Sequence, residues 1–104
     1  MNADGSVFRA LADPTRRQIL QELRGGEMAA GEIAALFPMK APSVSRHLSL
    51  LKGAGLIAER RDGNRIFYSV VEERLALTVG SFVSAICPRQ VLVRRTTRRP
   101  GRRP

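Results

Sequence analysis

Residues 43–47 contain four polar side chains that could recognise DNA bases. Serine hydroxyls can hydrogen-bond to several bases, and an arginine can donate two hydrogen bonds to the major-groove acceptors of guanine. The apolar residues Val44, Leu48 and Leu51 recur at spacings of four and three, which predicts a helix with one buried face. We expect the opposite face, near the start of this helix, to present the candidate base-reading residues Ser43, Ser45, Arg46 and His47.

A second group of polar residues lies in a predicted β-hairpin. Residues 56–61 and 65–71 are rich in Ile, Val, Phe and Tyr, and Asp62-Gly63-Asn64 separates them, which is typical of two strands joined by a tight turn. Such a hairpin could bring guanidinium groups to flanking phosphates or into the minor groove. With one lysine that precedes the helix, the candidate phosphate-contacting residues are Lys40, Arg60, Arg61, Asn64 and Arg65.

Each of these residues, taken alone, has a simpler explanation. Ser43 and Ser45 could be first-turn helix residues without a ligand, His47 could be a surface or core-edge histidine, and the arginines could only keep an exposed hairpin soluble. The order of the elements favours DNA binding. Two short helices joined by Pro38-Met39-Lys40 and followed by a basic hairpin indicate a winged helix-turn-helix, whose second helix lies in the major groove.

The remaining elements complete a fold that is mainly α with a small β-hairpin. Asp13 is a good N-cap and Pro14 a good first residue, so a helix should begin there. Its residues Ile19, Leu20 and Leu23 are expected to point inward. The sequence predicts four helices, then the hairpin, then a fifth helix. We expect these helices to run from 6 to 12, from 13–14 to 25–26, from 30 to 37, from 41–42 to 53 or 55, and from 72 to 88. The apolar residues of the third helix are Ile33, Leu36 and Phe37.

Two apolar stripes at opposite ends of the chain predict a dimer. The stripe on the last helix is too broad for one short helix that covers a small body, and the first helix supplies a second stripe. We expect both to pack across a two-fold axis, which makes the interface isologous. The alternative is that both stripes close the core of the single chain. The expected interface residues are Val7, Phe8, Leu11, Leu75, Val79, Phe82, Val83 and Ile86.

The positive charge of the chain is concentrated in its last segment. The chain has 104 residues, which fits one domain, and its net charge is +9. Seven arginines and no acidic residue follow from Arg89 onward, whereas residues 1–88 carry 11 basic and 9 acidic groups. We therefore expect a DNA-binding and dimerisation domain at 1–88 and a disordered arginine-rich tail at 89–104. The tail could add affinity for DNA without reading sequence, or only keep the protein soluble.

Several function classes are excluded by composition. The chain has one cysteine, Cys87, and one histidine, His47, so we expect no disulfide within the chain, no metal site and no cofactor; two Cys87 side chains could meet only across a dimer axis. No nucleophile–base pair or phosphate loop is recognisable, so an enzyme is not expected. The N-terminus does not resemble a signal peptide, and the longest uncharged run, residues 75–88, is shorter than the ~20 residues of a membrane helix. These observations predict a cytoplasmic protein without membrane insertion.

Four segments carry a family resemblance. They are residues 13–20 (Asp-Pro-Thr-Arg-Arg-Gln-Ile-Leu), 30–34 (Ala-Gly-Glu-Ile-Ala), 42–48 (Pro-Ser-Val-Ser-Arg-His-Leu) and 51–57 (Leu-Lys-Gly-Ala-Gly-Leu-Ile). In combination they resemble ArsR-type winged-helix repressors over about residues 6–86, and they look most similar to the SdpR-like subgroup of autorepressors. The resemblance implies a homodimer built from the first and last helices. It also implies an operator upstream of the protein's own or neighbouring genes.

The chain departs from the metal-sensing members of that family. It lacks their Cys-x-Cys motif in the third helix, it has no histidine between residues 72 and 88, and Cys87 is its single cysteine. Lys40 stands where many relatives have a serine that caps the recognition helix. We therefore expect a sequence-specific homodimeric repressor without metal sensing, open to control by an anti-repressor protein. The alternatives are a non-specific architectural or RNA-binding protein that uses the tail, and a winged-helix adaptor that binds another protein.

Overall fold

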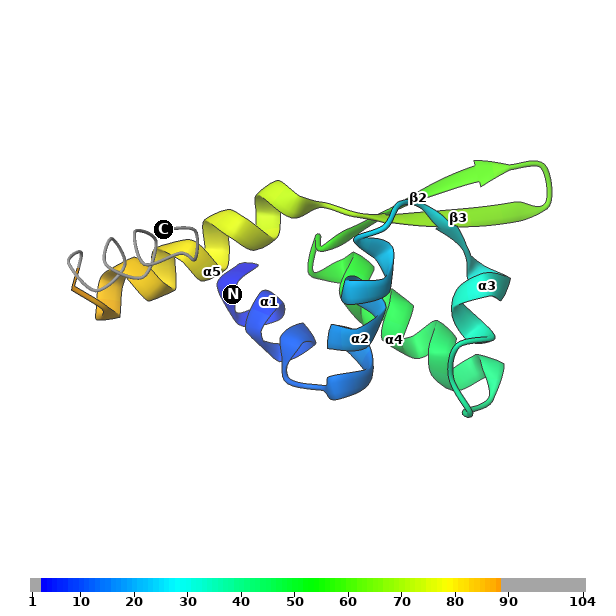
Figure 1. Ribbon diagram of the computed structural model, residues 1–104, viewed down its shortest axis with the longest axis horizontal. Helices are drawn as coiled ribbons and strands as arrows, with labels where there is room; N and C mark the ends of the chain where they lie inside the picture. Colours follow the sequence, from blue (N-terminus) through cyan, green and yellow to red (C-terminus); the bar gives the residue numbers. More distant parts are fainter. Residues whose placement is uncertain (1–2, 89–104) are drawn as a thin grey trace, which may run out of the picture.

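The computed structural model describes residues 3–88, which form five helices and a three-stranded sheet. Helices α1 to α4 form the body, and α5 and the β2–β3 hairpin extend from it in opposite directions (Figure 1). The predicted mainly helical winged helix-turn-helix is therefore confirmed. The predicted tail, residues 89–104, lies outside the described residues. The elements are α1 (Ala3–Leu11), α2 (Pro14–Leu23), β1 (Met28–Ala29), α3 (Ala30–Ala34), α4 (Ala41–Gly53), β2 (Ile57–Asp62), β3 (Arg65–Val70) and α5 (Glu72–Ile86).

The apolar core joins all four helices of the body to the start of β2. Removing these aliphatic side chains from water is the main driving force for packing α1 to α4 together. The inward positions predicted for α2 and α4 all belong to it, together with Ile33 of α3. The core residues are Val7, Ala10, Ile19, Leu20, Leu23, Ile33, Val44, Leu48, Leu51, Ala54, Leu56 and Ile57.

Local sequence signals account for most helix boundaries. Asp13 is the N-cap of α2, and its carboxylate accepts from the backbone N–H of Thr15 at 2.7 Å. Gly55, after the end of α4, has a φ of 78°, a left-handed conformation that glycine adopts without strain. Helix α5 begins at Glu72 as predicted, and its two glutamates lie at the positive end of the helix dipole.

Two helix boundaries differ clearly from the prediction, and smaller differences occur at the ends of α1, α2 and α5. Helix α1 begins at Ala3, three residues before the expected start. Helix α3 ends at Ala34 instead of residue 37, because the chain tightens after it. The N–H groups of Leu36 and Phe37 donate to carbonyls three residues earlier, at 3.0 and 3.3 Å, which forms a tight turn. Phe37 still packs on the core, whereas Leu36 is exposed.

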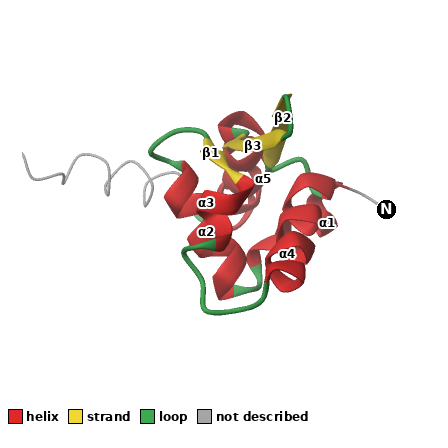
Figure 2. Cartoon of the chain, turned by 90° about the vertical axis from the view of Figure 1, so that its right-hand side faces the viewer, coloured by secondary structure: helices red, strands yellow, loops and turns green. Residues whose placement is uncertain are grey.

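The wing is an antiparallel hairpin extended by a third, very short strand. The strand order is β1-β3-β2, and Figure 2 shows the three strands at the top of the helical body. Asp62 pairs with Arg65, so the loop is Gly63–Asn64, and Asp62 belongs to β2 instead of the three-residue turn segment that the sequence indicated. Gly63 has a φ of 64° and is the first loop residue, as in a type II′ turn. Strand β1 pairs Met28 with Tyr68, and the sequence analysis did not predict it.

Helix α5 contributes no buried residue. Its main aromatic contact is with α1, where the ring centroids of Phe8 and Phe82 are 5.2 Å apart at 63°. Phe82 is 51% exposed and Ile86 is 63% exposed, so the C-terminal part of the apolar stripe of α5 is open to solvent, whereas Leu75 near its start packs against the core. The expectation that Val7 belongs to the same exposed surface is wrong. Val7 is fully buried in the core of its own chain, because α1 turns this side toward α2 and α4.

Candidate DNA-binding face

The outer face of α4 presents three of the four predicted base-reading residues. Ser43, Ser45 and Arg46 are exposed, while the other face of the helix supplies buried residues to the core. Lys40 is the N-cap of α4, is exposed and makes no side-chain cap hydrogen bond. This end of the helix therefore combines small hydroxyls, one long cation and a second cation at the N-cap. That combination suits base edges and a neighbouring phosphate.

His47 is placed differently from the other three residues. It is half-buried on the flank of α4, and its Nδ1 lies 3.2 Å from Nη1 of Arg16. Arg16 belongs to α2, and sequence reasoning gave it no role in the site although it lies in the Asp13–Leu20 motif. Only the tertiary structure shows this contact, because the two residues are 31 positions apart.

The loop between α1 and α2 is held by polar contacts from residues 13–17. Partial burial raises the pKa of the Asp13 carboxyl, but hydrogen bonds from the backbone N–H groups of Thr15 and Arg16 outweigh it, so the pKa is lowered overall. The guanidinium of Arg17 donates to the carbonyl of Leu11 at 2.8 Å, at the end of α1. These contacts orient the start of α2, from which Arg16 reaches α4.

The tip of the wing carries the exposed residues Arg61, Asn64 and Arg65. The guanidinium of Arg65 lies 4.9 Å from the ring centroid of Phe67 on the same strand. This cation–π contact limits the positions that the side chain can take without neutralising its charge. The wing therefore presents cations at its end, as the sequence predicted.

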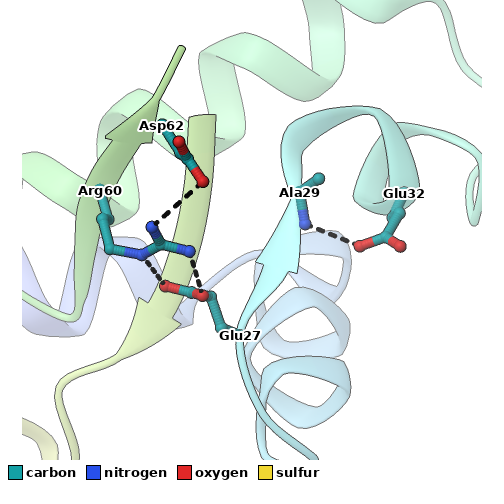
Figure 3. Close-up of polar contacts among 5 residues, drawn as sticks. All are labelled: Glu27, Ala29, Glu32, Arg60 and Asp62. Atoms are coloured by element: carbon teal, nitrogen blue, oxygen red, sulfur yellow. Dashed lines mark hydrogen bonds and ion pairs between the residues drawn. The ribbon is translucent and has the colours of Figure 1, made fainter. Parts of the chain in front are cut away.

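Arg60 is held within the protein by a two-point contact with a carboxylate. Its Nε and Nη2 donate to the two carboxylate oxygens of Glu27 at 2.9 and 2.8 Å, and Nη1 lies 3.9 Å from Asp62 (Figure 3). The Arg60 guanidinium also stacks 4.6 Å from the ring centroid of Phe67. The hydrogen bond from Arg60 lowers the pKa of Glu27, and the same contact raises the pKa of Arg60. Arg60 is thus a brace for the wing, and Glu27 occupies two of the donors that we expected to contact a phosphate.

The loop that carries Glu27 is connected to α3 by one further hydrogen bond. The backbone N–H of Ala29 donates to Oε1 of Glu32 at 2.8 Å (Figure 3). A glutamate at the third helical position that accepts from the N-cap N–H is one half of a capping box. The wing brace is therefore anchored to the first helix of the helix-turn-helix.

Ion pairs connect the wing to the C-terminal end of α4. Nζ of Lys52 lies 2.6 Å from a carboxylate oxygen of Glu59, and Nε of Arg61 lies 3.6 Å from the other oxygen. The hydrogen bond from Lys52 lowers the pKa of the Glu59 carboxyl. These ion pairs are solvent-exposed, so we assign them to orientation of the wing rather than to stability.

The described residues contain neither a metal centre nor a membrane helix. Between residues 3 and 88, no group of three or more His, Cys, Asp or Glu side chains is placed to hold a metal ion. No helix in this part of the chain is long and apolar enough to cross a membrane. Cys87 is half-buried at the end of α5.

Comparison with known proteins identifies the family. Residues 11–60 match the helix-turn-helix domain family. The chain is 51% identical over 65 residues to the transcriptional repressor SdpR of Bacillus subtilis (strain 168), across 62% of this chain and 72% of SdpR. The crystal structure of an ArsR-family transcriptional regulator matches with a TM-score of 0.76 and 30% identity, covering 81% of this chain and 91% of that chain. The chain belongs to the ArsR family.

This ArsR-family regulator is also similar to a second solved structure. That structure is the homodimeric winged helix-turn-helix DNA-binding domain Mb0332 of Mycobacterium bovis, which matches with 36% identity and a TM-score of 0.67. That match covers 80% of this chain and 78% of the other. ArsR proteins are DNA-binding transcriptional regulators and not enzymes, which confirms both the predicted class and the predicted absence of catalysis.

Proposed function

We propose that this ArsR-family regulator is a homodimeric repressor that binds a specific DNA operator. The observation that carries the proposal is the face formed by the start of α4 and the tip of the wing. Its proposed base-reading residues are Ser43, Ser45 and Arg46, with His47 at the flank, and its proposed phosphate contacts are Lys40, Arg61, Asn64 and Arg65. Arg60 holds the wing in place through Glu27 and supports this face indirectly.

The proposed dimer interface is the surface formed by α1 and α5. Support comes from α5 itself, which has no buried residue and exposes Phe82 and Ile86. The homodimeric state of the Mycobacterium bovis domain supports it as well. A two-fold axis here would place the recognition helices one helical turn apart on DNA, about 34–36 Å. The proposed interface contains Phe8, Leu11, Leu75, Val79, Phe82, Val83 and Ile86, without the buried Val7.

We further propose that repression does not depend on a metal ion or on thiol chemistry. A zinc site needs three or four donors, and His47 and Cys87 lie on different helices. Two Cys87 side chains could approach each other only across the dimer axis. Operator binding should therefore be unchanged by zinc or by oxidant, measured in parallel on the natural chain and on Cys87→Ser. A response that Cys87→Ser abolishes would contradict this proposal.

The test of the main proposal is a selection of bound duplexes from a random DNA pool, followed by competition at fixed salt. A specific repressor should prefer its selected duplex over random DNA by ~10³-fold or more. Equal binding to both would favour a non-specific protein that uses its basic tail. Absence of DNA binding would favour the adaptor role. Control by an anti-repressor protein stays a prediction.

A further inference from the structure

Arg16 is a buried cation whose contacts connect three helices. It is 9% exposed and is the only buried charged side chain among residues 5–88. Its Nε donates to the carbonyl of Ala10 at 2.7 Å, and its Nη2 donates to the carbonyl of Arg9 at 2.9 Å. Its Nη1 makes the contact with Nδ1 of His47 on α4. All three acceptors are uncharged when the imidazole is neutral. The Asp13 carboxylate at the start of α2 is a charged neighbour of both Arg16 and His47, and their positive charges contribute to lowering its pKa.

The two carbonyl contacts fix the guanidinium in one orientation. Arg9 and Ala10 lie in the last turn of α1, where carbonyl groups lack the i+4 partner that they would have inside the helix. The Arg9 carbonyl accepts both from Arg16 and from the backbone N–H of Ala12, at 3.2 Å. The negative end of the helix dipole also favours a cation at this place. Because the guanidinium is a rigid planar fork, fixing Nε and Nη2 on α1 also fixes the direction in which Nη1 points. Nη1 is therefore a preset donor aimed at α4.

This preset donor determines which nitrogen of His47 can carry the proton. An arginine has only donors, so Nδ1 must be the acceptor in the Arg16–His47 contact. An imidazole that accepts at Nδ1 carries its proton on Nε2. We propose that Arg16 is a positioning residue for DNA recognition, holding His47 in the Nε2–H form so that it meets DNA only as a hydrogen-bond donor.

The proposal names the kind of DNA atom that His47 contacts, and it rests on the proposed DNA-binding function. A donor at Nε2 can bind a phosphate oxygen or a base acceptor such as N7 or O6 of guanine, N7 of adenine or O4 of thymine. It cannot accept from the amino groups of cytosine or adenine. His47 therefore differs from Ser43 and Ser45, whose hydroxyls both donate and accept.

Two substitutions at position 47 separate the contact with Arg16 from the contact with DNA. In His47→Asn, Oδ1 lies three bonds from Cα, as Nδ1 of histidine does. The acceptor for Arg16 therefore remains, while the Nε2–H donor that faces DNA is lost. In His47→Gln, the amide nitrogen lies four bonds from Cα, as Nε2 of histidine does, so a donor toward DNA remains while the acceptor for Arg16 is lost. Gln21→Ala, at an exposed position of α2, is the matched control.

The two variants should change affinity and stability in opposite ways. His47→Asn should bind the selected duplex about tenfold more weakly and melt close to the natural chain. His47→Gln should bind within about threefold of the natural chain but melt about 4 °C lower, as expected for one lost hydrogen bond in a chain of this size. The control should change neither quantity. Natural-chain affinity in His47→Asn, or a lower melting temperature in His47→Asn than in His47→Gln, would overturn the proposal.

The DNA side of the contact is distinguished with the same variants. If the acceptor is a phosphate, His47→Asn weakens binding to selected and random duplexes alike. If the acceptor is a base, His47→Asn relaxes the preference at one base pair. Removing the acceptor there, by a 7-deazapurine where it is N7 or by replacing the thymine where it is O4, then weakens binding of the natural chain but not of His47→Asn. A natural chain without a preferred duplex would refute the proposed repressor function. A preferred duplex bound equally by His47→Asn and the natural chain would refute only the role of His47.

The role of Arg16 is read directly from the imidazole, because His47 is the only histidine of the chain. Its ¹⁵N spectrum at about pH 8, where a free imidazole is neutral, should show Nδ1 without a proton and Nε2 with one. In Arg16→Met, which keeps an unbranched aliphatic chain and removes every donor, the Nδ1–H form should appear, and DNA binding should fall about as far as in His47→Asn. A protonated Nδ1 in the natural chain would overturn the proposal. If Arg16→Met does not fold, the spectrum of the natural chain and the position-47 variants decide.

Discussion

Replacing Phe82 tests whether α1 and α5 form the dimer interface. Phe82 is 51% exposed, and its ring packs edge-on against Phe8, which is 36% exposed. In a symmetric dimer each protomer removes the exposed part of its own Phe82 ring from water, so this area is buried twice. Phe82→Ala deletes this area without adding a charge, so the change in dimer affinity follows from burial alone.

The expected magnitude comes from the exposed fraction. Burying a whole phenylalanine side chain contributes about 2 kcal/mol, so the exposed half contributes about 1 kcal/mol in each protomer. Two protomers give about 2 kcal/mol, which is about a 30-fold weaker dimer at 1.4 kcal/mol per tenfold. Phe82→Asp should be more severe, because it places an unpaired carboxylate in the interface.

Sedimentation equilibrium over a concentration series measures the dimer dissociation constant directly, and thermal melting by circular dichroism verifies that the variants fold. Leu77→Ala is the matched control. Leu77 is 64% exposed and lies five residues from Phe82, about 140° around the same helix, so it should have no effect. An unchanged dissociation constant in Phe82→Ala, or an equal loss in Leu77→Ala, would refute the proposed interface.

Four further predictions concern the DNA-binding face and the tail. Arg46→Ala should cost about 1–3 kcal/mol of binding and relax the preference at one operator position, whereas an unchanged ranking of operator variants would show that α4 is not the reading helix. Arg65→Ala should weaken all duplexes alike and lower the salt slope by about 1; a sequence-dependent loss would assign it to base reading. Arg60 lowers the pKa of Glu27 below 4.5, so their contact is present above that pH and is lost as the pH falls through the lowered pKa. Hydrogen exchange of the β2–β3 amides should become faster over this pH range in the natural chain. Glu27→Gln, which cannot titrate, should not show this change. Deleting residues 89–104 should weaken selected and random duplexes by similar factors with a shallower salt dependence, and loss of specificity would instead assign base reading to the tail.

Much of the fold was predictable because its signals are local. The spacing of Val44, Leu48 and Leu51 defines one helix face, and Asp13-Pro14 supplies an N-cap and a first helical residue. The predicted exposure of Ser43 and Arg46 followed from the same helical period. Each of these patterns operates within one or two helical turns, a distance over which neighbours in sequence are also neighbours in space.

Short elements at the edge of the fold were harder to predict. Strand β1 has two residues and exists only because Met28 and Ala29 pair with Tyr68 and Phe67 of β3. The early end of α3 depends on the tight turn after Ala34, which its apolar pattern does not reveal.

Local sequence patterns were enough to predict the order of the helices, their apolar faces and the segment that resembles a recognition helix. How the polar side chains are used depends on tertiary packing. Arg60 and Arg65 look alike in sequence, but Arg60 is paired with Glu27, 33 residues away. His47 resembles its exposed neighbours, but its contact with Arg16 spans 31 residues. The physical reason is that an ion pair or side-chain hydrogen bond depends on atoms within about 3 Å, and only packing brings distant segments that close.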